Sequence, residues 1–225
     1  MPTVCRMVVK ICGITRAGDA RAAVDAGASA LGFVFWPKSP RCIDPYRARA
    51  IVSGLPAFVT AVGVFVNQPV EYVNAVCRTV GLGAAQLHGD ESVAYVSGVR
   101  RPVVKAVTLG GPDNSTGLVG VDAWPASVTL LLDVHDPVAR GGTGRTVDWT
   151  VAASIARRRR TLLAGGLTPE NVAAAVTEVE PFGIDVSSGV ETAPGVKDPA
   201  RIRALFEALK LARVGDGQHT SARMG

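Results

Sequence analysis

Short apolar runs alternate along the chain with segments in which apolar residues recur at helical spacing. The apolar runs are nearly continuous, which is typical of strands buried on both faces of a parallel sheet. We expect eight strands, at 7–13, 30–36, 58–67, 84–89, 102–109, 128–134, 161–167 and 183–190. The clearest helical patterns cover 19–27, 44–55, 69–81, 168–176 and 198–209. Several of these open with Asp or Thr, sometimes followed by Pro, which are signals of a helix N-terminus.

Eight alternations of strand and helix predict a single α/β domain built as a closed (β/α)₈ TIM barrel. An open, doubly wound sheet is the alternative, but no GxGxxG motif follows the first apolar run. We expect the barrel to span 1–213 and residues 214–225 to form a disordered tail. Within the barrel, segment 110–127 predicts a short helix or a loop after the fifth strand.

Composition narrows the class of protein. Hydrophobic residues make up 48% and charged residues 19%, which fits a folded chain and not a disordered one. The apolar runs are too short to cross a bilayer and the N-terminus carries no export signal, so we expect a cytoplasmic protein without a membrane partner. The four cysteines lack metal-ligand or CxxC spacing, which favours free thiols and no metal site.

The net charge of +5 raises the question of a nucleic-acid partner. Much of it comes from the run Arg157–Arg160, which we interpret as a solvated helix end. Aromatic residues make up only 5% of the chain and none lies beside this run, whereas single-strand binders interleave aromatics with basic residues. We therefore expect no nucleic acid, and a basic protein suited to a small anionic substrate.

Polar side chains occur at the ends of three predicted strands. Cys12, His88 and Asp133 all fall at carboxyl ends, where the active sites of (β/α)₈ barrels lie. Taken singly, each has an ordinary interpretation: a buried thiol, a core histidine, and a cap or a partner for Lys10. Together, the three positions predict a catalytic site.

Other charged residues lie within the strands themselves. Lys10 shares one face of the first strand with Cys12, while Lys105 and Asp185 lie in the fifth and eighth strands. Charges in such strands are costly unless they are paired or used. Lys10, Lys105 and Asp185 could therefore belong to the site or form an interior ion-pair network without chemistry.

Two segments predict a phosphate site. Gly165 and Gly166 end the seventh strand, and Ser187, Ser188 and Gly189 end the eighth. The loops after these two strands are the recurrent phosphate site of the barrel, where backbone N–H groups and a helix N-terminus face the anion. Ordinary turn glycines are the alternative.

Two further loops could contact a substrate. The segment 135–149 after the sixth strand is long and rich in glycine, including Gly142 and Gly144, which suits a flap. Arg41 follows the second strand in the loop WPKSPR, from which its planar guanidinium could bind an anionic group. A surface arginine is the alternative for Arg41.

The chain resembles the phosphoribosylanthranilate isomerase family of tryptophan biosynthesis. The resemblance rests on KICGIT, LGFVFWPKSPR, VGVFVN, QLHG, LLLD, GGTGRTVDW, LAGGLTPENV and DVSSGVE, which occur in this order and extend to about Leu209. It implies an aldose–ketose isomerase that performs a cofactor-free Amadori rearrangement of N-(5′-phosphoribosyl)anthranilate. It also implies that Cys12 is the general base, that Asp133 is the general acid and that Arg41 binds the anthranilate carboxylate.

The resemblance further implies that the glycine and serine loops hold the substrate phosphate. The residues concerned are Gly165, Gly166, Ser187, Ser188 and Gly189, while Gly142 and Gly144 of the predicted flap are expected to bind the substrate. We also expect Lys10, His88 and Asp185 to line the substrate site, with Lys10 favouring the thiolate form of Cys12 and Gly13 allowing a sharp turn behind it.

Several alternatives remain. The histidine-pathway isomerase uses an aspartate where Cys12 stands, a ribulose-phosphate epimerase needs a metal-binding His/Asp set, and an indole-forming barrel needs a lysine–glutamate arrangement not found here. A barrel that only senses a phosphorylated metabolite would not need Cys12 together with Asp133. We expect a monomer or a homodimer.

Overall fold

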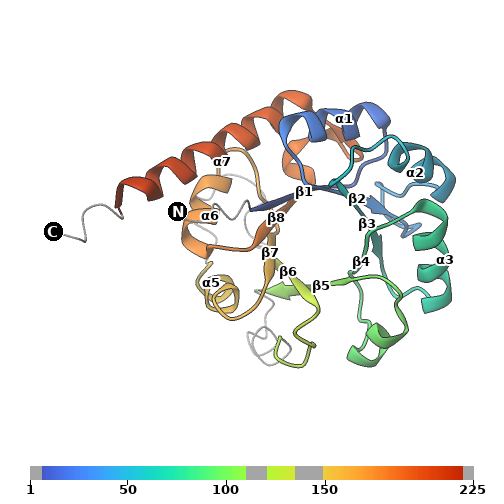
Figure 1. Ribbon diagram of the computed structural model, residues 1–225. Helices are drawn as coiled ribbons and strands as arrows, with labels where there is room; N and C mark the ends of the chain where they lie inside the picture. The colour runs from blue at the N-terminus through green and yellow to red at the C-terminus, as the bar shows by residue number, and fades with distance from the viewer. Residues whose placement is uncertain (1–6, 110–120, 135–148, 220–225) are drawn as a thin grey trace.

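The computed structural model describes residues 7–109, 121–134 and 149–219, with residues 134 and 213–219 described for the backbone alone. Eight parallel strands pair in chain order and close into a barrel, which confirms the predicted fold (Figure 1). The strands are β1 Val8–Cys12, β2 Ala30–Val34, β3 Thr60–Phe65, β4 Ala84–Leu87, β5 Val103–Leu109, β6 Thr129–Val134, β7 Thr161–Ala164 and β8 Gly183–Val186.

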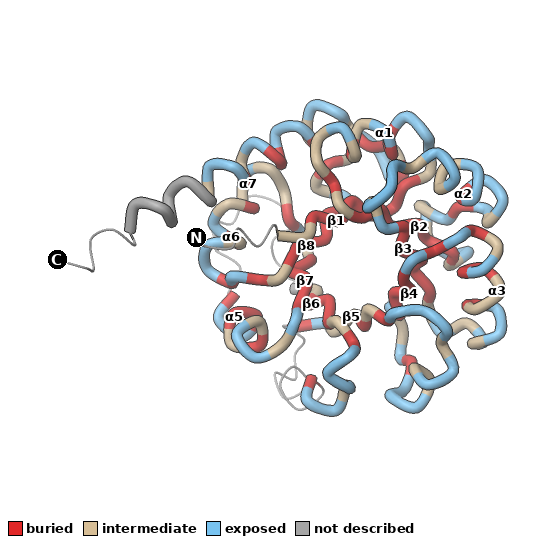
Figure 2. The backbone as a smooth tube through the Cα atoms, in the orientation of Figure 1, coloured by how far each residue is buried: buried red, intermediate tan, exposed pale blue. Residues whose placement is uncertain are grey.

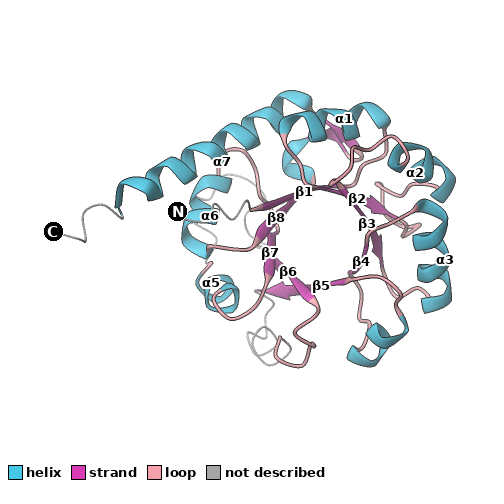
Figure 3. Ribbon diagram, in the orientation of Figure 1, coloured by secondary structure: helices cyan, strands magenta, loops and turns pink. Residues whose placement is uncertain are grey.

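Helices surround the barrel (Figure 3). They are α1 Ala17–Ala26, α2 Pro45–Val52, α3 Val70–Val80, α5 Thr150–Ala156, α6 Val172–Val179 and α7 Pro199–His219, with the 3₁₀ turns η1 Val93–Gly98 and η2 Ser188–Val190. The helices α1, α2, α3, α5 and α6 lie between successive strands and α7 follows the last one. The start of α2 follows the predicted signal, whereas α1 and α6 begin after Arg16 and Asn171 without a side-chain cap. The carboxylate of Asp44 accepts hydrogen bonds from the N–H groups of Tyr46 and Arg47, and Pro45 is the first residue of α2.

Most strand residues are buried, as the continuous apolar runs predict, and β5 is the least buried strand of the barrel, with Thr108 exposed (Figure 2). One large cluster of apolar side chains fills the space between strands and helices. The alternate residues of the strands point into the barrel, where Ala30, Val62 and Ala84 form one cluster and Cys12, Val34 and Val64 form another. The even-numbered positions of β1 therefore face the interior, including Lys10 and Cys12.

A small antiparallel hairpin follows β8. It consists of β9 Glu191–Ala193 and β10 Val196–Lys197. It brings a stretch of chain that is distant in sequence from β1 back toward the start of the barrel: Thr15 Oγ1 donates a hydrogen bond of 2.5 Å to the carbonyl of Gly195. The hairpin was not expected from the apolar pattern, since it is short and exposed along β9.

The basic run differs in part from our expectation. Arg157 does cap the C-terminus of α5, as predicted. Arg159, however, is not simply solvated, because its guanidinium donates hydrogen bonds of 3.0 to 3.4 Å to four backbone carbonyls of the segment before β6. The acceptors are the carbonyls of Val121, Trp124, Pro125 and Val128. Arg159 therefore has a structural role in anchoring this segment.

Two other predictions concern segments that the structure describes only in part. The helix α7 runs to His219, past the predicted start of the tail at 214, so the barrel boundary at 213 stays a prediction. Residues 110–120, which cover most of the uncertain segment after β5, lie outside the described residues. Among the helices that the structure describes, none is long and apolar enough to span a membrane.

Candidate active site

Cys12 is the last residue of β1, at the end of the barrel where the strands finish. Its side chain is 8% exposed and free of any disulfide, and it packs inside the barrel beside Val34 and Val64. The following residue, Gly13, has a φ of 81°, a left-handed conformation that glycine adopts without strain. A Cβ at Gly13 would also lie 2.6 Å from Cδ of Arg41. Glycine is therefore needed both for the turn behind the thiol and for the close approach of Arg41.

A chain of polar side chains crosses the barrel interior from β8 to β6. The Nζ atom of Lys10 lies 2.9 Å from Oδ1 of Asp185 and donates a second hydrogen bond of 2.9 Å to Oε1 of Gln86. The amide nitrogen of Gln86 lies 2.9 Å from Nδ1 of His88. On the other side of the ring, Nε2 of His88 lies 3.6 Å from Oδ2 of Asp133. Four of the predicted site residues are thus brought into one network.

The direction of these hydrogen bonds fixes the tautomer of His88. A lysine ammonium can only donate, so the oxygen of the Gln86 amide faces Lys10 and its NH₂ group donates to Nδ1 of His88. The neutral imidazole then carries its proton on Nε2, which is the atom that faces Asp133. Asp133 is consequently not the partner of Lys10, the alternative raised by the sequence, because Asp185 fills that role.

The environment of Cys12 disfavours its thiolate. Burial raises the pKa of the thiol, the negative charge of Asp185 raises it further, and the positive charge of Lys10 lowers it. The net result is a pKa above the ordinary value for cysteine. Lys10 thus acts in the expected direction, but its charge is shared with Asp185 and does not outweigh burial. Asp185 and Cys12 in turn raise the pKa of Lys10 against the effect of its own burial.

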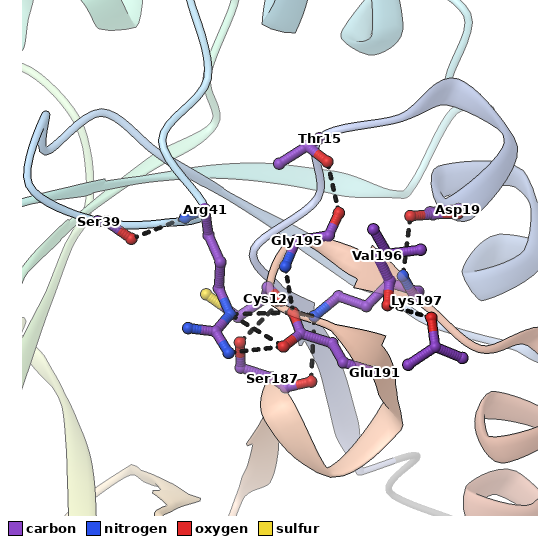
Figure 4. Close-up of polar contacts among 11 residues, drawn as sticks. Cys12, Thr15, Asp19, Ser39, Arg41, Ser187, Glu191, Gly195, Val196 and Lys197 are labelled. Atoms are coloured by element: carbon purple, nitrogen blue, oxygen red, sulfur yellow. Dashed lines mark hydrogen bonds and ion pairs between the residues drawn. The ribbon is translucent and has the colours of Figure 1, made fainter.

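Arg41 reaches the same region from the β2–α2 loop and contacts Glu191 of the hairpin (Figure 4). Its Nε atom donates to Oε1 of Glu191 at 2.9 Å, and its Nη2 atom donates to Oε2 at 2.6 Å. Lys197 adds a third contact, with Nζ 2.8 Å from Oε1 of Glu191 and 3.0 Å from the carbonyl of Ser187. Ser187 Oγ donates a hydrogen bond of 3.2 Å to the carbonyl of Cys12, which ties this cluster to β1.

The charges of this cluster stabilise one another. Burial alone would raise the pKa of Glu191, but the hydrogen bonds from Arg41 and Lys197 lower it below its usual range. Burial lowers the pKa of Lys197, and the carboxylate of Glu191 opposes this effect. Glu191 is therefore an anion held between two cations.

The two predicted phosphate loops lie against each other at the ends of β7 and β8. A Cβ at Gly189 would overlap the carbonyl of Leu167, so only glycine allows this approach. Asn171 orders the first loop by donating a hydrogen bond of 3.0 Å to the carbonyl of Gly166. Gly166 and Ser188 are exposed in these loops.

Comparison with known proteins identifies the family. Residues 9–208 match the family model described as N-(5′-phosphoribosyl)anthranilate (PRA) isomerase. The N-(5′-phosphoribosyl)anthranilate isomerase of Pelobacter propionicus is 47% identical over 205 residues, which cover 91% of this chain and 96% of that protein.

This chain belongs to the N-(5′-phosphoribosyl)anthranilate isomerase family. The resemblance drawn from the motifs is confirmed, and with it the prediction of an isomerase of tryptophan biosynthesis. Solved phosphoribosylanthranilate isomerases agree in fold. The enzyme of Thermotoga maritima superposes with a TM-score of 0.81 at 43% identity, covering 91% of this chain and 98% of that one.

A further solved member of the phosphoribosylanthranilate isomerase family carries a ligand. It is a complex with reduced 1-(o-carboxyphenylamino)-1-deoxyribulose 5-phosphate, and it has a TM-score of 0.79 and 40% identity over 91% of this chain and 98% of that one. The site of that protein therefore accepts a phosphorylated ketose analogue with a carboxyphenyl group.

Within this phosphoribosylanthranilate isomerase barrel, the structure separates Lys105 from the other interior charges. Its neighbours Val104 and Ala106 pack against the apolar cluster inside the barrel, so Lys105 points outward, toward the helix layer. There its Nζ atom lies 2.8 Å from Oε2 of Glu91 and 5.6 Å from the centre of the Trp124 ring. Among the described residues, Lys105 therefore joins no network with Lys10 and Asp185, although such a network was one of the two alternatives left open by the sequence.

Glu191 and Lys197 were missed by the sequence analysis. Glu191 ends the motif DVSSGVE, but nothing in the pattern of apolar residues indicates that a hairpin returns it toward Arg41. Gln86 lies on the same strand face as His88, and its contact with both Lys10 and His88 depends on barrel closure. The signal that could have found all three is the cost of burying an unpaired charge, which demands a partner for Arg41 and for Lys10.

Some predicted residues lie outside the described residues. Gly142 and Gly144, with residues 135–148 of the predicted flap, are among them, so their part in the site stays a prediction. In the part of the chain that the structure describes, no group of three or more His, Cys, Asp or Glu side chains could hold a metal ion.

Proposed function

We propose that this protein converts N-(5′-phosphoribosyl)anthranilate to 1-(2-carboxyphenylamino)-1-deoxyribulose 5-phosphate by general acid–base catalysis, in the cytoplasm and without a cofactor. The observation that carries the proposal is the position of Cys12 and Asp133. Both lie at the carboxyl end of strands of one barrel, and the network through Lys10, Gln86 and His88 connects their surroundings. The ligand of the solved relative supports the choice of substrate.

The reaction needs one acid and one base acting on the two ends of a sugar. Asp133 gives a proton to the furanose ring oxygen, the C1′–O bond breaks, and the anilino nitrogen forms a protonated Schiff base with C1′. Cys12 then takes the proton from C2′, which leaves an enolamine that tautomerises to the ketone at C2′. No net oxidant is required, because the electrons released at C2′ reduce C1′ of the same molecule. Each assisted proton transfer contributes about 10²–10⁴-fold in rate.

The state of Cys12 sets the pH dependence of this scheme. A thiol with a raised pKa is mostly protonated near neutral pH, so only a minor fraction of the free enzyme carries the thiolate. The positive charges of Lys10 and Lys197 both act in favour of that fraction. A base with a high pKa is also a strong proton acceptor, which suits the removal of a proton from carbon.

The remaining predicted residues would hold the substrate. Arg41 binds the anthranilate carboxylate, and the loops at Gly165–Gly166 and Ser187–Gly189 bind the phosphate. The exposure of Gly166 and Ser188 supports the second assignment. Lys10, Asp185 and His88 act behind the substrate by orienting the acid and the base.

The experiment is a fluorescence assay of the purified protein with N-(5′-phosphoribosyl)anthranilate, whose anthranilate fluorescence is lost on conversion. We expect turnover that survives treatment with EDTA and a product identical in mass to the substrate. The histidine-pathway aminoaldose phosphate serves as the competing substrate, on which we expect far weaker turnover. Absence of turnover on the anthranilate substrate, or faster turnover on its competitor, contradicts the proposal. That the protein is a monomer or a homodimer and binds no nucleic acid stays a prediction.

A further inference from the structure

The hairpin β9–β10 carries the charged side chains of Glu191 and Lys197 to the carboxyl end of β1 and is held there by hydrogen bonds. Its backbone is held by Thr15, which donates to the carbonyl of Gly195, and by Asp19, whose Oδ2 atom accepts a 3.0 Å hydrogen bond from the N–H of Lys197 (Figure 4). Asp19 is itself buried in the first turn of α1. Glu191 and Lys197 therefore lie on a hairpin whose backbone is held in place by Thr15 and Asp19.

Glu191 contacts only one edge of the Arg41 guanidinium. That edge is formed by Nε, which donates to Oε1 at 2.9 Å and to Oε2 at 3.2 Å, and by one N–H of Nη2, which donates to Oε2 at 2.6 Å. A guanidinium has five N–H groups, so the opposite edge, formed by Nη1 and the second N–H of Nη2, keeps its donors. Among the described residues, no other acceptor contacts the Arg41 side chain. The free edge has the shape that binds a carboxylate through two parallel hydrogen bonds.

The net charge of Arg41, Glu191 and Lys197 together matches a ligand carboxylate of charge −1. Arg41 and Lys197 each contribute +1 and Glu191 contributes −1, which gives +1 for the three side chains together. The Glu191 and Lys197 side chains are almost completely buried, with exposed fractions of 4% and 0%. Without Glu191, two like charges would face each other in a poorly solvated site, and the long Arg41 side chain would have no fixed partner.

We propose that Glu191 is a positioning residue for substrate recognition: it holds Arg41 by one edge so that the other edge binds the ring carboxylate of the substrate, while Lys197 balances its charge. The inference rests on the proposed function, since it assumes that Arg41 meets that carboxylate. It extends that function by assigning the selection of an ortho-carboxylated aromatic amine to a three-residue cluster built on the hairpin.

Two opposing physical effects make the proposal testable. Replacing Glu191 by Gln raises the cluster from +1 to +2, so long-range attraction alone predicts tighter binding of a carboxylate. Positioning predicts weaker binding, because the guanidinium loses its charged anchor and must be ordered by the ligand itself. The sign of the change in affinity therefore separates the two.

The experiment is calorimetric titration with two ligands, the reduced 1-(2-carboxyphenylamino)-1-deoxyribulose 5-phosphate and its phenylamino counterpart without the carboxylate. The ratio of their two dissociation constants reports the carboxylate contact alone, since any change at the phosphate loops affects both ligands equally. We expect Glu191→Gln to reduce this ratio about tenfold, from the lost alignment of one charged hydrogen-bonded pair. Glu207→Gln, at an exposed carboxylate on α7 that pairs with Lys210, is the matched control and should leave the ratio unchanged.

A second variant keeps the test valid if the single variant folds poorly. Glu191→Gln with Lys197→Met removes both buried charges and restores the net charge to +1, so no unpaired cation is left in the hairpin. We expect its ratio to remain reduced, because Arg41 is still without its anchor. A ratio equal to that of the wild type, in either variant, overturns the inference. Failure of the proposed function looks different: the wild type itself would then not prefer the carboxylated ligand.

Discussion

Nε2 of His88 lies 3.6 Å from a carboxylate oxygen of Asp133, and the opposite nitrogen of the same ring is held by Gln86. The imidazole is therefore fixed from behind by a residue that is itself hydrogen-bonded to Lys10. Because Lys10 and Cys12 share the inner face of β1, the surroundings of the proposed acid and base belong to one connected network. Displacement of one side chain in the network should therefore change the surroundings of both Cys12 and Asp133.

His88→Leu should lower kcat about 10- to 100-fold with little change in KM, because the substituted side chain cannot direct an N–H toward Asp133 and the carboxyl loses its orientation. His88→Gln, which can still place an amide N–H there, should retain more of the activity. Steady-state kinetics with N-(5′-phosphoribosyl)anthranilate measure both variants. Equal activity of His88→Leu and the wild type would show that the ring does not orient the acid.

The thiol of Cys12 should alkylate with an unusual pH dependence. Its pKa is raised, so the midpoint of its reaction with iodoacetamide should lie above the ordinary value of about 8.5. Lys10→Met should move this midpoint higher, because it removes a positive charge and leaves the negative charge of Asp185 beside the thiol. Mass spectrometry of the Cys12 peptide gives the rate at each pH.

The double variant Lys10→Met with Asp185→Asn is the control for that shift. It removes both charges, so the midpoint should fall back from that of the single variant while staying above the ordinary value because of burial. Exposed Cys42 supplies an internal reference in the same digest. If the midpoint of Cys12 alkylation is the same in Lys10→Met and the wild type, Lys10 does not favour the thiolate.

Lys105 should contribute to stability and not to turnover. Its ion pair with Glu91 is buried, with an N–O distance of 2.8 Å, so Lys105→Met should cost about 3–5 kcal/mol of unfolding free energy at pH 7 and leave kcat unchanged. Urea denaturation and the fluorescence assay measure the two quantities. A large loss of kcat in a folded variant would instead indicate that Lys105 takes part in the reaction.

The same pair predicts how stability depends on pH. Burial acts to raise the pKa of Glu91, but hydrogen bonds from Lys105 and from the backbone lower it below that of the unfolded chain. The stabilisation is therefore complete above the unfolded value of about 4.3 and is lost as pH falls through the lower, folded value. The difference in unfolding free energy between wild type and Lys105→Met should accordingly shrink below about pH 4. A constant difference down to pH 3 would contradict this assignment.

The fold could be predicted because the strands are continuous apolar runs. Most of these runs are followed by a segment in which apolar residues recur at helical spacing. Buried parallel strands leave this signal in the sequence whatever their partners are. The placement of Cys12, His88 and Asp133 could be predicted because all strands of a parallel barrel end on the same face. Residues at the carboxyl ends of different strands therefore lie on one side of the barrel.

The side on which Lys105 points could not be predicted so simply. A continuous apolar strand has no polar face to reveal its orientation, and only the packing of Val104 and Ala106 in the closed barrel assigns it. The partners of Arg41 and Arg159 depend on contacts between segments that are 150 and more than 30 residues apart. Such contacts leave no periodic signal, although the cost of burying a charge indicates that a partner must exist.

The most direct test of the account is the turnover number of Cys12→Ser and Asp133→Asn, each compared with a conservative control at an exposed position, Cys42→Ser and Asp122→Asn. We predict that kcat falls by about 10²–10⁴-fold in each of the first two variants, while the dissociation constant of the reduced ketose phosphate changes by only a few-fold. The controls should keep wild-type turnover. If either Cys12→Ser or Asp133→Asn folds normally and retains kcat within a few-fold of the wild type, these two side chains are not the base and the acid.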